Sequence, residues 1–299
     1  MTVSEALQRA SLLLREAGLR EPRREAAALL CAALHKPPAW VYAHGEETLD
    51  PAAAALFFAW TERRRRREPY AYLTGEREFM GLPFAVTPAV LIPRPETEVL
   101  VTVAAGILQN HPAPHILDVG TGSGVIACVL ALQLPAARVC AVDISREALL
   151  VAARNAARHG VAERIRFLQG DLYAPVAGEQ FSAVVSNPPY IPAGEIGTLE
   201  PDVRDYEPRA ALDGGPDGLH FYRRLTAELP KLGCRPQLLC LEVGFGQAEA
   251  VAEMCRACGF ARVDIYPDLA GIPRVVAACC DESFSGQCKP EGKKKRHAD

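Results

Sequence analysis

The alternation of strand-like and helix-like segments after residue 114 limits the folds open to this chain most strongly. Seven short apolar segments have the length and composition of buried strands: 115–119, 138–142, 165–169, 182–186, 237–243, 262–266 and 274–278. Stretches with helical periodicity, such as 124–132 and 145–157, separate the early ones. Strands that alternate with helices form βαβ units with parallel strands. The sequence therefore predicts an α/β protein with one doubly wound, Rossmann-like sheet of seven strands.

The first part of the chain has a different pattern and is expected to be all-helical. Apolar residues recur at helical spacing before Gly18, and Asp50 directly precedes Pro51, where it can cap a helix that ends near residue 68. Gly81 and Pro83 punctuate a short hairpin after it. The predicted boundaries are a small helical domain at 1–78, a hairpin linker at 79–92, a catalytic domain at 93–282 and a disordered basic tail at 283–299.

The charge balance and the cysteines narrow the class of protein. With 33 basic and 36 acidic residues the formal charge is −3, so the chain is not a general binder of polyanions. The longest apolar runs, about ten residues, are too short to span a bilayer. The single C-x-x-C, Cys255 and Cys258, lacks a second ligand pair, so we expect reduced thiols and no metal site. We expect a monomeric, cytoplasmic protein that contacts neither membranes nor nucleic acid.

A glycine-rich turn follows the first strand of the alternating region. Its residues are Gly120, Thr121, Gly122, Ser123 and Gly124. Glycine allows positive φ and close approach of a ligand, and the free N–H groups of the following helix face that ligand. A dinucleotide motif needs a third glycine at position 125, which is Val125. The G-x-G-x-G spacing just after Asp118 resembles motif I of the class I S-adenosylmethionine-dependent methyltransferases, while an ordinary tight turn is the alternative.

Two later strands end near carboxylates. Asp143 ends the second strand, about 20 residues after the loop, and can accept hydrogen bonds from both hydroxyls of a ribose. The resemblance to the methyltransferases implies that Asp171, after the third strand, accepts from the adenine amine and that Leu172 packs on the ring. These three residues and the glycine turn form the predicted binding site for S-adenosyl-L-methionine.

A proline-rich motif follows the fourth strand. Its residues are Asn187, Pro188, Pro189 and Tyr190. Each proline fixes φ and lacks an N–H, so the Pro188 carbonyl has no neighbouring donor competing for it. A planar amide or aryl amine is a poor nucleophile because its lone pair is delocalised. The Asn187 side-chain carbonyl and the Pro188 carbonyl can accept its two N–H groups and aim the nitrogen at the methyl donor, while Tyr190 packs on the flat group.

We therefore assign catalysis to Asn187, Pro188 and Tyr190, and substrate binding to all four residues of the motif, with Asn187 also positioned to touch the cofactor. Methyltransferases with this motif act on adenine, on guanine or on the glutamine side-chain amide. The motif thus defines the chemistry and leaves the substrate open.

Further segments of the chain resemble the release-factor glutamine methyltransferases (PrmC/HemK type). The matching stretches are 70–75, 78–79, 91–98, 118–124, 187–190, 206–212, 214–219 and 242–247. The resemblance implies methylation of the side-chain amide nitrogen (N5) of the glutamine in the Gly-Gly-Gln motif of class 1 peptide chain release factors, a step in translation termination. Because every predicted catalytic feature lies after residue 91, we expect the helical domain to recognise the protein substrate.

Two rival functions share part of this pattern. A nucleic-acid amino methyltransferase, acting on adenine or guanine, has the same motif but needs a basic recognition surface, which the charge of −3 does not favour. A non-catalytic cofactor-binding protein does not need an intact proline-rich motif. The five arginines at 63–67 could bind an acidic partner, although we favour a solvated helix face.

Overall fold

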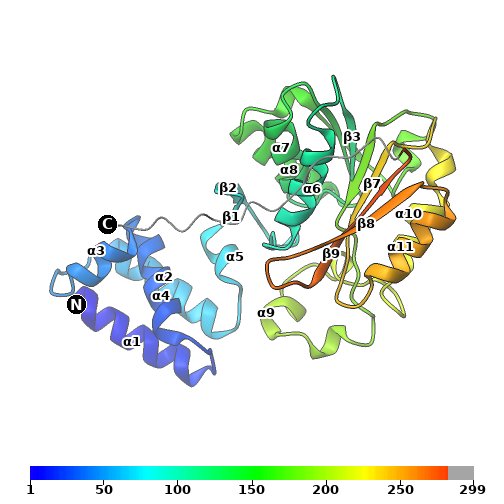
Figure 1. Cartoon of the computed structure of the whole chain (residues 1–299). Helices are drawn as coiled ribbons and strands as arrows, with labels where there is room; N and C mark the ends of the chain where they lie inside the picture. The colour runs from blue at the N-terminus through cyan, green and yellow to red at the C-terminus, as the bar shows by residue number, and fades with distance from the viewer. Residues whose placement is uncertain (282–299) are drawn as a thin grey trace, which may run out of the picture. The chain divides into compact units, whose positions relative to one another are not determined.

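The computed structural model describes residues 1–281 and divides them into two compact units (Figure 1). One, which we call the helical unit, comprises Met1–Arg77, Val86–Pro88 and Gly197–Glu207. The other, the sheet unit, comprises Glu78–Ala85, Ala89–Ile196 and the described residues from Pro208 onward. A short segment from the middle of the chain therefore belongs with the N-terminal helices. The predicted tail at 283–299 lies outside the described residues.

Local signals in the sequence set the ends of the helices in the helical unit. These helices are α1 (Val3–Glu16), α2 (Pro22–Leu34), α3 (Pro38–Ala43), α4 (Pro51–Arg65), α5 (Tyr70–Thr74) and α9 (Pro201–Arg204). Thr2 and Glu5 form a capping box at α1. The Asp50 carboxylate caps α4 by accepting from the Ala53 N–H at 3.0 Å, as predicted. Across residues 1–281, no helix combines the length and apolar content needed to cross a bilayer.

The described residues of the sheet unit contain a seven-stranded, mostly parallel sheet, which confirms the predicted fold. Its strands are β3 (His115–Val119), β4 (Arg138–Asp143), β5 (Ile165–Gln169), β6 (Ala183–Ser186), β7 (Leu238–Glu242), β8 (Arg262–Pro267) and β9 (Pro273–Cys279). The spatial order is β5-β4-β3-β6-β7-β9-β8, and only β9 runs antiparallel to its neighbours. The chain order reverses between β3 and β6, which creates a crevice at the carboxyl ends of these strands.

Helices cover both faces of the sheet, so the central strands are largely buried on both sides, whereas the edge strands β5 and β8 are only partly buried (Figure 1). They are α6 (Thr97–Leu108), α7 (Val125–Gln133), α8 (Arg146–Arg158), α10 (His220–Ala227) and α11 (Ala248–Ala257). Successive residues of a strand point to opposite faces. Accordingly Ile116 packs in the cluster with α6 and α7, whereas Leu117 packs in the cluster with α10 and α11. Double burial explains why the central strands are continuous apolar runs.

A two-stranded hairpin, β1 (Glu76–Phe79) and β2 (Leu82–Ala85), precedes the large sheet. The predicted hairpin is confirmed, although its first strand begins three residues earlier than residue 79. Both turn residues, Met80 at φ 50° and Gly81 at φ 75°, are left-handed. This is the geometry of a type I′ turn, whose twist matches that of the two strands.

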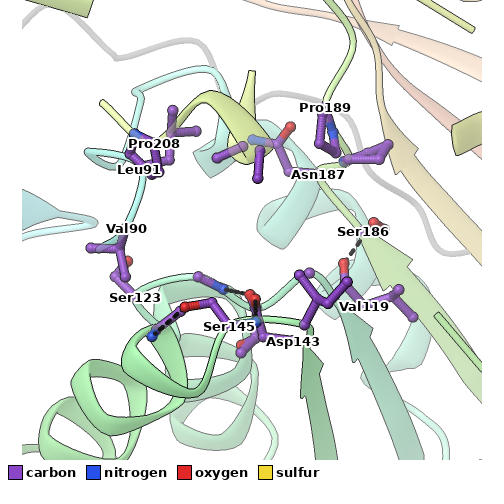
Figure 2. A pocket seen from close by; sticks show the side chains of 18 of the residues that line it. Val90, Leu91, Val119, Ser123, Asp143, Ser145, Ser186, Asn187, Pro189 and Pro208 are labelled. Atoms are coloured by element: carbon purple, nitrogen blue, oxygen red, sulfur yellow. Dashed lines mark hydrogen bonds between the residues drawn. The ribbon is translucent and has the colours of Figure 1, made fainter. Parts of the chain in front are cut away.

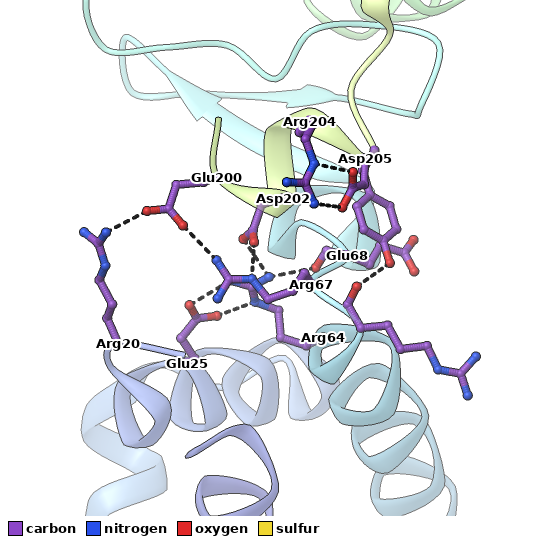
Figure 3. Close-up of polar contacts among 11 residues, drawn as sticks. Arg20, Glu25, Arg64, Arg67, Glu68, Glu200, Asp202, Arg204 and Asp205 are labelled. Carbon is purple, nitrogen blue, oxygen red and sulfur yellow. Dashed lines mark hydrogen bonds and ion pairs between the residues drawn. The ribbon is translucent and has the colours of Figure 1, made fainter. Parts of the chain in front are cut away.

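The interpretation of residues 63–67 as a solvated helix face is wrong for two of the five arginines. The Arg64 side chain is 7% exposed and pairs with Glu25 at 2.6 Å and with Asp202 at 2.7 Å. Arg67 pairs with the other oxygen of Asp202 at 2.6 Å and with Glu200 at 3.2 Å (Figure 3). These arginines can be buried because several carboxylates pair with their guanidinium groups. This network holds the Gly197–Glu207 segment against α2 and α4 within the helical unit.

The remaining part of the arginine run agrees better with a solvated surface. Arg66 is 72% exposed and Arg65 is 38% exposed, and both pair with Glu62 one turn earlier on the helix. Water screens exposed pairs of this kind, so they contribute little to stability. Arg64 and Arg65 are adjacent in sequence but have opposite environments because they lie on different sides of α4, while Arg66 and Arg67 follow the last residue of that helix.

Candidate active site

A cavity of about 530 Å³ opens at the carboxyl ends of β3, β4, β5 and β6 in the sheet unit (Figure 2). Its wall contains ten of the predicted site residues: Gly120, Thr121, Gly122, Ser123, Asp143, Asp171, Leu172, Asn187, Pro188 and Pro189. Figure 2 shows Asn187 and Pro189 across the cavity from Asp143 and Ser123. The reversal of strand order between β3 and β6 places these sequence-distant residues around one space.

The glycine turn has the backbone geometry that requires glycine. Gly120, Gly122 and Gly124 have φ values of 73°, 55° and 79°. A Cβ at Gly120 or Gly122 would meet no atom within 4 Å, whereas a Cβ at Gly124 would lie 2.9 Å from the Cβ of Ala152 on α8. The first two glycines therefore leave open space beside the turn. Gly124, which is not part of the cavity wall, permits close packing of α8.

The carboxyl group of Asp118 lies directly behind the glycine turn. Asp118 is fully buried, and its Oδ2 accepts from the Thr121 hydroxyl at 2.6 Å. Burial raises the pKa of Asp118 to about 7. Asp118 therefore stabilises the turn through its hydrogen bond to Thr121, and it is not one of the residues that line the cavity.

Asp143 joins the glycine turn to the start of α8. Its Oδ2 accepts from the Gly122 N–H at 2.8 Å, and its Oδ1 accepts from the Ser145 N–H at 2.9 Å (Figure 2). Burial raises the pKa of this carboxyl, while the N–H groups of Ser145 and Gly122 counteract part of that effect. A carboxylate has about four acceptor positions, so Asp143 retains acceptor capacity toward the cavity.

Asp171 and Leu172, the residues predicted to contact adenine, also line the cavity, but Asp171 is paired with an arginine. Asp171 pairs with the Arg224 guanidinium through bonds of 3.1 and 2.7 Å. That hydrogen bonding holds the pKa of Asp171 below its usual value. Leu172 is largely buried and has a left-handed φ of 46°. No sequence pattern linked Arg224, on α10, to Asp171.

The proline-rich motif begins where β6 ends. Ser186 donates to the Val119 carbonyl at 2.7 Å and so ties the end of β6 to the end of β3. Asn187 lines the cavity and donates from Nδ2 to the Thr97 hydroxyl at 3.1 Å. Tyr190 is not part of the cavity wall; its carbonyl accepts from the Gln247 amide at 2.9 Å, and burial raises the pKa of its phenol to about 12.

Sequence reasoning assigned no role to two residues beside Asn187. Thr97 begins α6 and lines the cavity, and Glu242 ends β7 with 1% exposure. The Glu242 carboxyl is hydrogen-bonded by Thr97 and Asn187, and burial raises its pKa to about 7. A carboxylate that ends an apolar strand was the signal used for Asp143, and the same signal could have identified Glu242.

The fold and the cavity together define a Rossmann-like methyltransferase domain. A family model described as the methyltransferase small domain matches residues 97–198. Among solved structures, the catalytic domain of hMettl16 in complex with a MAT2A 3′UTR hairpin has the same fold, with a TM-score of 0.54 at 15% identity. That match covers 78% of this chain and 83% of that chain.

Closer relatives specify the family. A family model described as the PrmC N-terminal domain matches residues 5–75. The release factor glutamine methyltransferase of Moorella thermoacetica is 47% identical over 93% of this chain and 98% of its own length. That of Geobacter sulfurreducens is 44% identical over 92% of this chain and 95% of its own length. The chain belongs to the release factor glutamine methyltransferase family and is a methyltransferase enzyme, which confirms the family predicted from the sequence.

Proposed function

We propose that this enzyme transfers a methyl group from S-adenosyl-L-methionine to the side-chain amide nitrogen (N5) of the glutamine in the Gly-Gly-Gln motif of class 1 peptide chain release factors. The observation that carries this proposal is that one cavity is lined by the glycine turn, Asp143 and the Asn187-Pro188 pair. The donor-binding and acceptor-binding elements thus share a single space. The relatives named for release factor glutamine methylation support the choice of substrate.

The cavity has the size and the polar groups that the methyl donor needs. About 530 Å³ lies within the range of small-molecule sites. Asp143 accepts from the ribose hydroxyls, Asp171 accepts from the adenine amine, and Leu172 covers the ring. The open space beside Gly120 and Gly122 admits the donor close to the backbone. When bound, S-adenosyl-L-methionine supplies an electrophilic methyl group.

The acceptor is held by two oxygens and needs no base before attack. The Asn187 Oδ1 and the Pro188 carbonyl accept the two N–H groups of the substrate amide and orient its nitrogen. The nitrogen gains a methyl group and then loses a proton to water. Tyr190 stays protonated because its pKa is about 12, so its phenol is not the base.

We assign recognition of the release factor to the helical part of the chain, predicted at 1–78, which matches the PrmC N-terminal domain model over residues 5–75. All the cavity-lining residues lie after residue 88, so the helical residues before it add no group to the cavity wall. A cytoplasmic location follows from a substrate that acts in translation termination.

Mass spectrometry of a release factor incubated with the enzyme and S-adenosyl-L-methionine tests the proposal. We expect one added methyl on the Gly-Gly-Gln glutamine. Asn187→Ala should slow turnover by roughly 10²–10³-fold, the scale of losing one positioned hydrogen-bond partner of the transition state. The control Asn110→Ala changes an exposed asparagine and should not alter turnover. Methylated DNA or RNA beside an unmodified release factor would favour the nucleic-acid alternative.

A further inference from the structure

We infer that Thr97 and Glu242 act as positioning residues, which orient the Asn187 amide so that its oxygen, and not its nitrogen, faces the substrate. This inference deepens the proposed function, because it rests on Asn187 receiving the acceptor amide. It concerns a choice between two atoms. The amide oxygen and nitrogen of asparagine have nearly the same shape, so only their hydrogen-bond partners decide which one faces the cavity.

The hydrogen bonds of the Asn187 side chain turn its nitrogen toward the protein. Asn187 Nδ2 donates one proton to the Thr97 hydroxyl at 3.1 Å, and the Asn187 side chain also hydrogen-bonds the Glu242 carboxyl. An amide nitrogen carries two protons and an ionised carboxylate only accepts. With the nitrogen turned toward Thr97 and Glu242, Oδ1 is the atom presented to the cavity.

Thr97 has one proton, which fixes the direction of the chain of hydrogen bonds. Its hydroxyl accepts from Asn187 and also hydrogen-bonds the Glu242 carboxyl, so its single proton goes to Glu242. If the Asn187 amide rotated by half a turn, its oxygen would face a carboxylate that has no proton to give. Two acceptors would then oppose each other in a buried site, which is unfavourable.

The surroundings of Glu242 disfavour its negative charge, so the ionised form that this role needs depends on pH. The residue is 1% exposed, and its Oε2 has no hydrogen-bond partner within the described part of the chain. The charged and titratable side chains that influence it or respond to it come from several elements: Glu96 before α6, Arg274 on β9, Tyr190 after β6 and Tyr222 on α10. Arg274 is itself paired with Asp268 at 3.0 Å. A protonated Glu242 would become a donor that can bond the amide oxygen, so the orientation depends on its ionised form.

The test compares two threonines on the same helix. Thr97→Val removes the hydroxyl that accepts from Asn187, whereas Thr102→Val removes an exposed hydroxyl that donates to the Glu98 carbonyl of its own helix at 2.7 Å. With release factor as substrate, we expect Thr97→Val to lower kcat by roughly 10-fold to 100-fold, on the scale of misplacing a reacting group, while Thr102→Val does not. Thr97→Ser, which restores a hydroxyl, should recover most of the loss. Calorimetric affinity for S-adenosyl-L-methionine should change less than about threefold in each variant, because the donor contacts are retained.

Glu242→Gln gives a second readout that a purely structural role would not produce. In the wild type, kcat should fall as the pH drops through about 7, where Glu242 takes up a proton. The variant cannot ionise at this position, so that limb should be absent. If Thr97→Val does not fold, the pH dependence of kcat in Glu242→Gln still tests the inference.

Two results would overturn the inference: a Thr97→Val turnover equal to that of Thr102→Val, or an unchanged acid limb in Glu242→Gln. A wild-type enzyme that leaves the release factor unmodified would instead overturn the proposed function. In that case ¹⁵N NMR of the Asn187 side-chain amide still tests the orientation, because it does not depend on activity. The proton bonded to Thr97 should show the shift of a hydrogen-bonded proton in the wild type and lose it in Thr97→Val, and an unchanged spectrum refutes the inference.

Discussion

The buried carboxyl of Glu242 makes the stability of this protein depend on pH in an unusual direction. Its pKa is about 7 in the folded chain, against 4.5 for an ordinary glutamate. Below pH 4.5 both the folded and the unfolded chain bind the proton, and between 4.5 and about 7 only the folded chain does. The folded state therefore binds more protons in this window, and the free energy of unfolding falls as the pH rises through it. Above pH 7 this contribution is constant.

The magnitude follows from the shift. A difference of about 2.5 pKa units corresponds to roughly 3 kcal/mol, and 1% exposure means that solvent screens little of it. Glu242→Gln removes the titration. The free energy of unfolding of the variant minus that of the wild type should therefore be about 2–3 kcal/mol higher at pH 8 than at pH 5, because only the wild type loses stability between these pH values. Comparing the two pH values cancels the pH-independent cost of altered hydrogen bonds to Thr97 and Asn187.

Urea unfolding at the two pH values measures this difference. Both tryptophans, Trp40 and Trp60, lie in the helical unit, so tryptophan fluorescence follows that unit, and far-UV circular dichroism adds the sheet unit. The matched control is Glu249→Gln, at an exposed position on α11, which should show no comparable dependence on pH. A difference below about 1 kcal/mol for Glu242→Gln would refute the reasoning.

Substitutions at three other sites test separate parts of the structure. Asp143→Ala should weaken binding of S-adenosyl-L-methionine by roughly 1–3 kcal/mol in calorimetry, because charge-assisted bonds to the ribose are lost; unchanged affinity would contradict the assignment. Arg64→Met leaves the Glu25 carboxylate without its partner and removes one of the two arginines paired with Asp202, so it should destabilise the helical unit by about 1–3 kcal/mol, whereas Arg65→Met, which removes an exposed pair with Glu62, should have much less effect, both followed by tryptophan fluorescence. Gly124→Ala combines a positive φ with a 2.9 Å clash and should cost about 2–4 kcal/mol, against about 1 for Gly160→Ala, where the φ is positive but the space is open; equal costs in thermal unfolding would argue against the packing role.

The sequence by itself determined the features that depend on neighbouring residues. Each of the seven predicted strands lies within one residue of an observed strand at both ends. The central strands are buried on both faces and so are apolar runs between turns, whereas the edge strands β5 and β8 are partly exposed and carry charged residues. Asp50 signalled the start of α4, and the glycine spacing signalled a turn with positive φ. These signals are local, so one pass along the chain detects them.

The common location of the predicted site residues could also be anticipated. Asp143, Asp171 and Asn187 all follow the carboxyl ends of parallel strands, and those ends meet at one edge of a sheet. The structure brings all three to the same cavity wall. The sequence did not indicate that Gly124 and Tyr190 lie outside that wall, because their positions depend on what packs against them: α8 packs closely on Gly124, and the Gln247 amide donates to the Tyr190 carbonyl.

Only the tertiary structure decided which charged residues are paired. Arg64 and Asp202 are 138 positions apart in the numbering, and Asp171 and Arg224 are separated by 53 residues. Asn187 and Thr97, separated by 90 residues, meet beside Glu242 for the same reason. The run at 63–67 has five identical residues, yet two of them are largely buried and others lie in solvent. Local composition cannot distinguish them, because burial and ion pairing arise from segments that the fold brings together from distant parts of the chain.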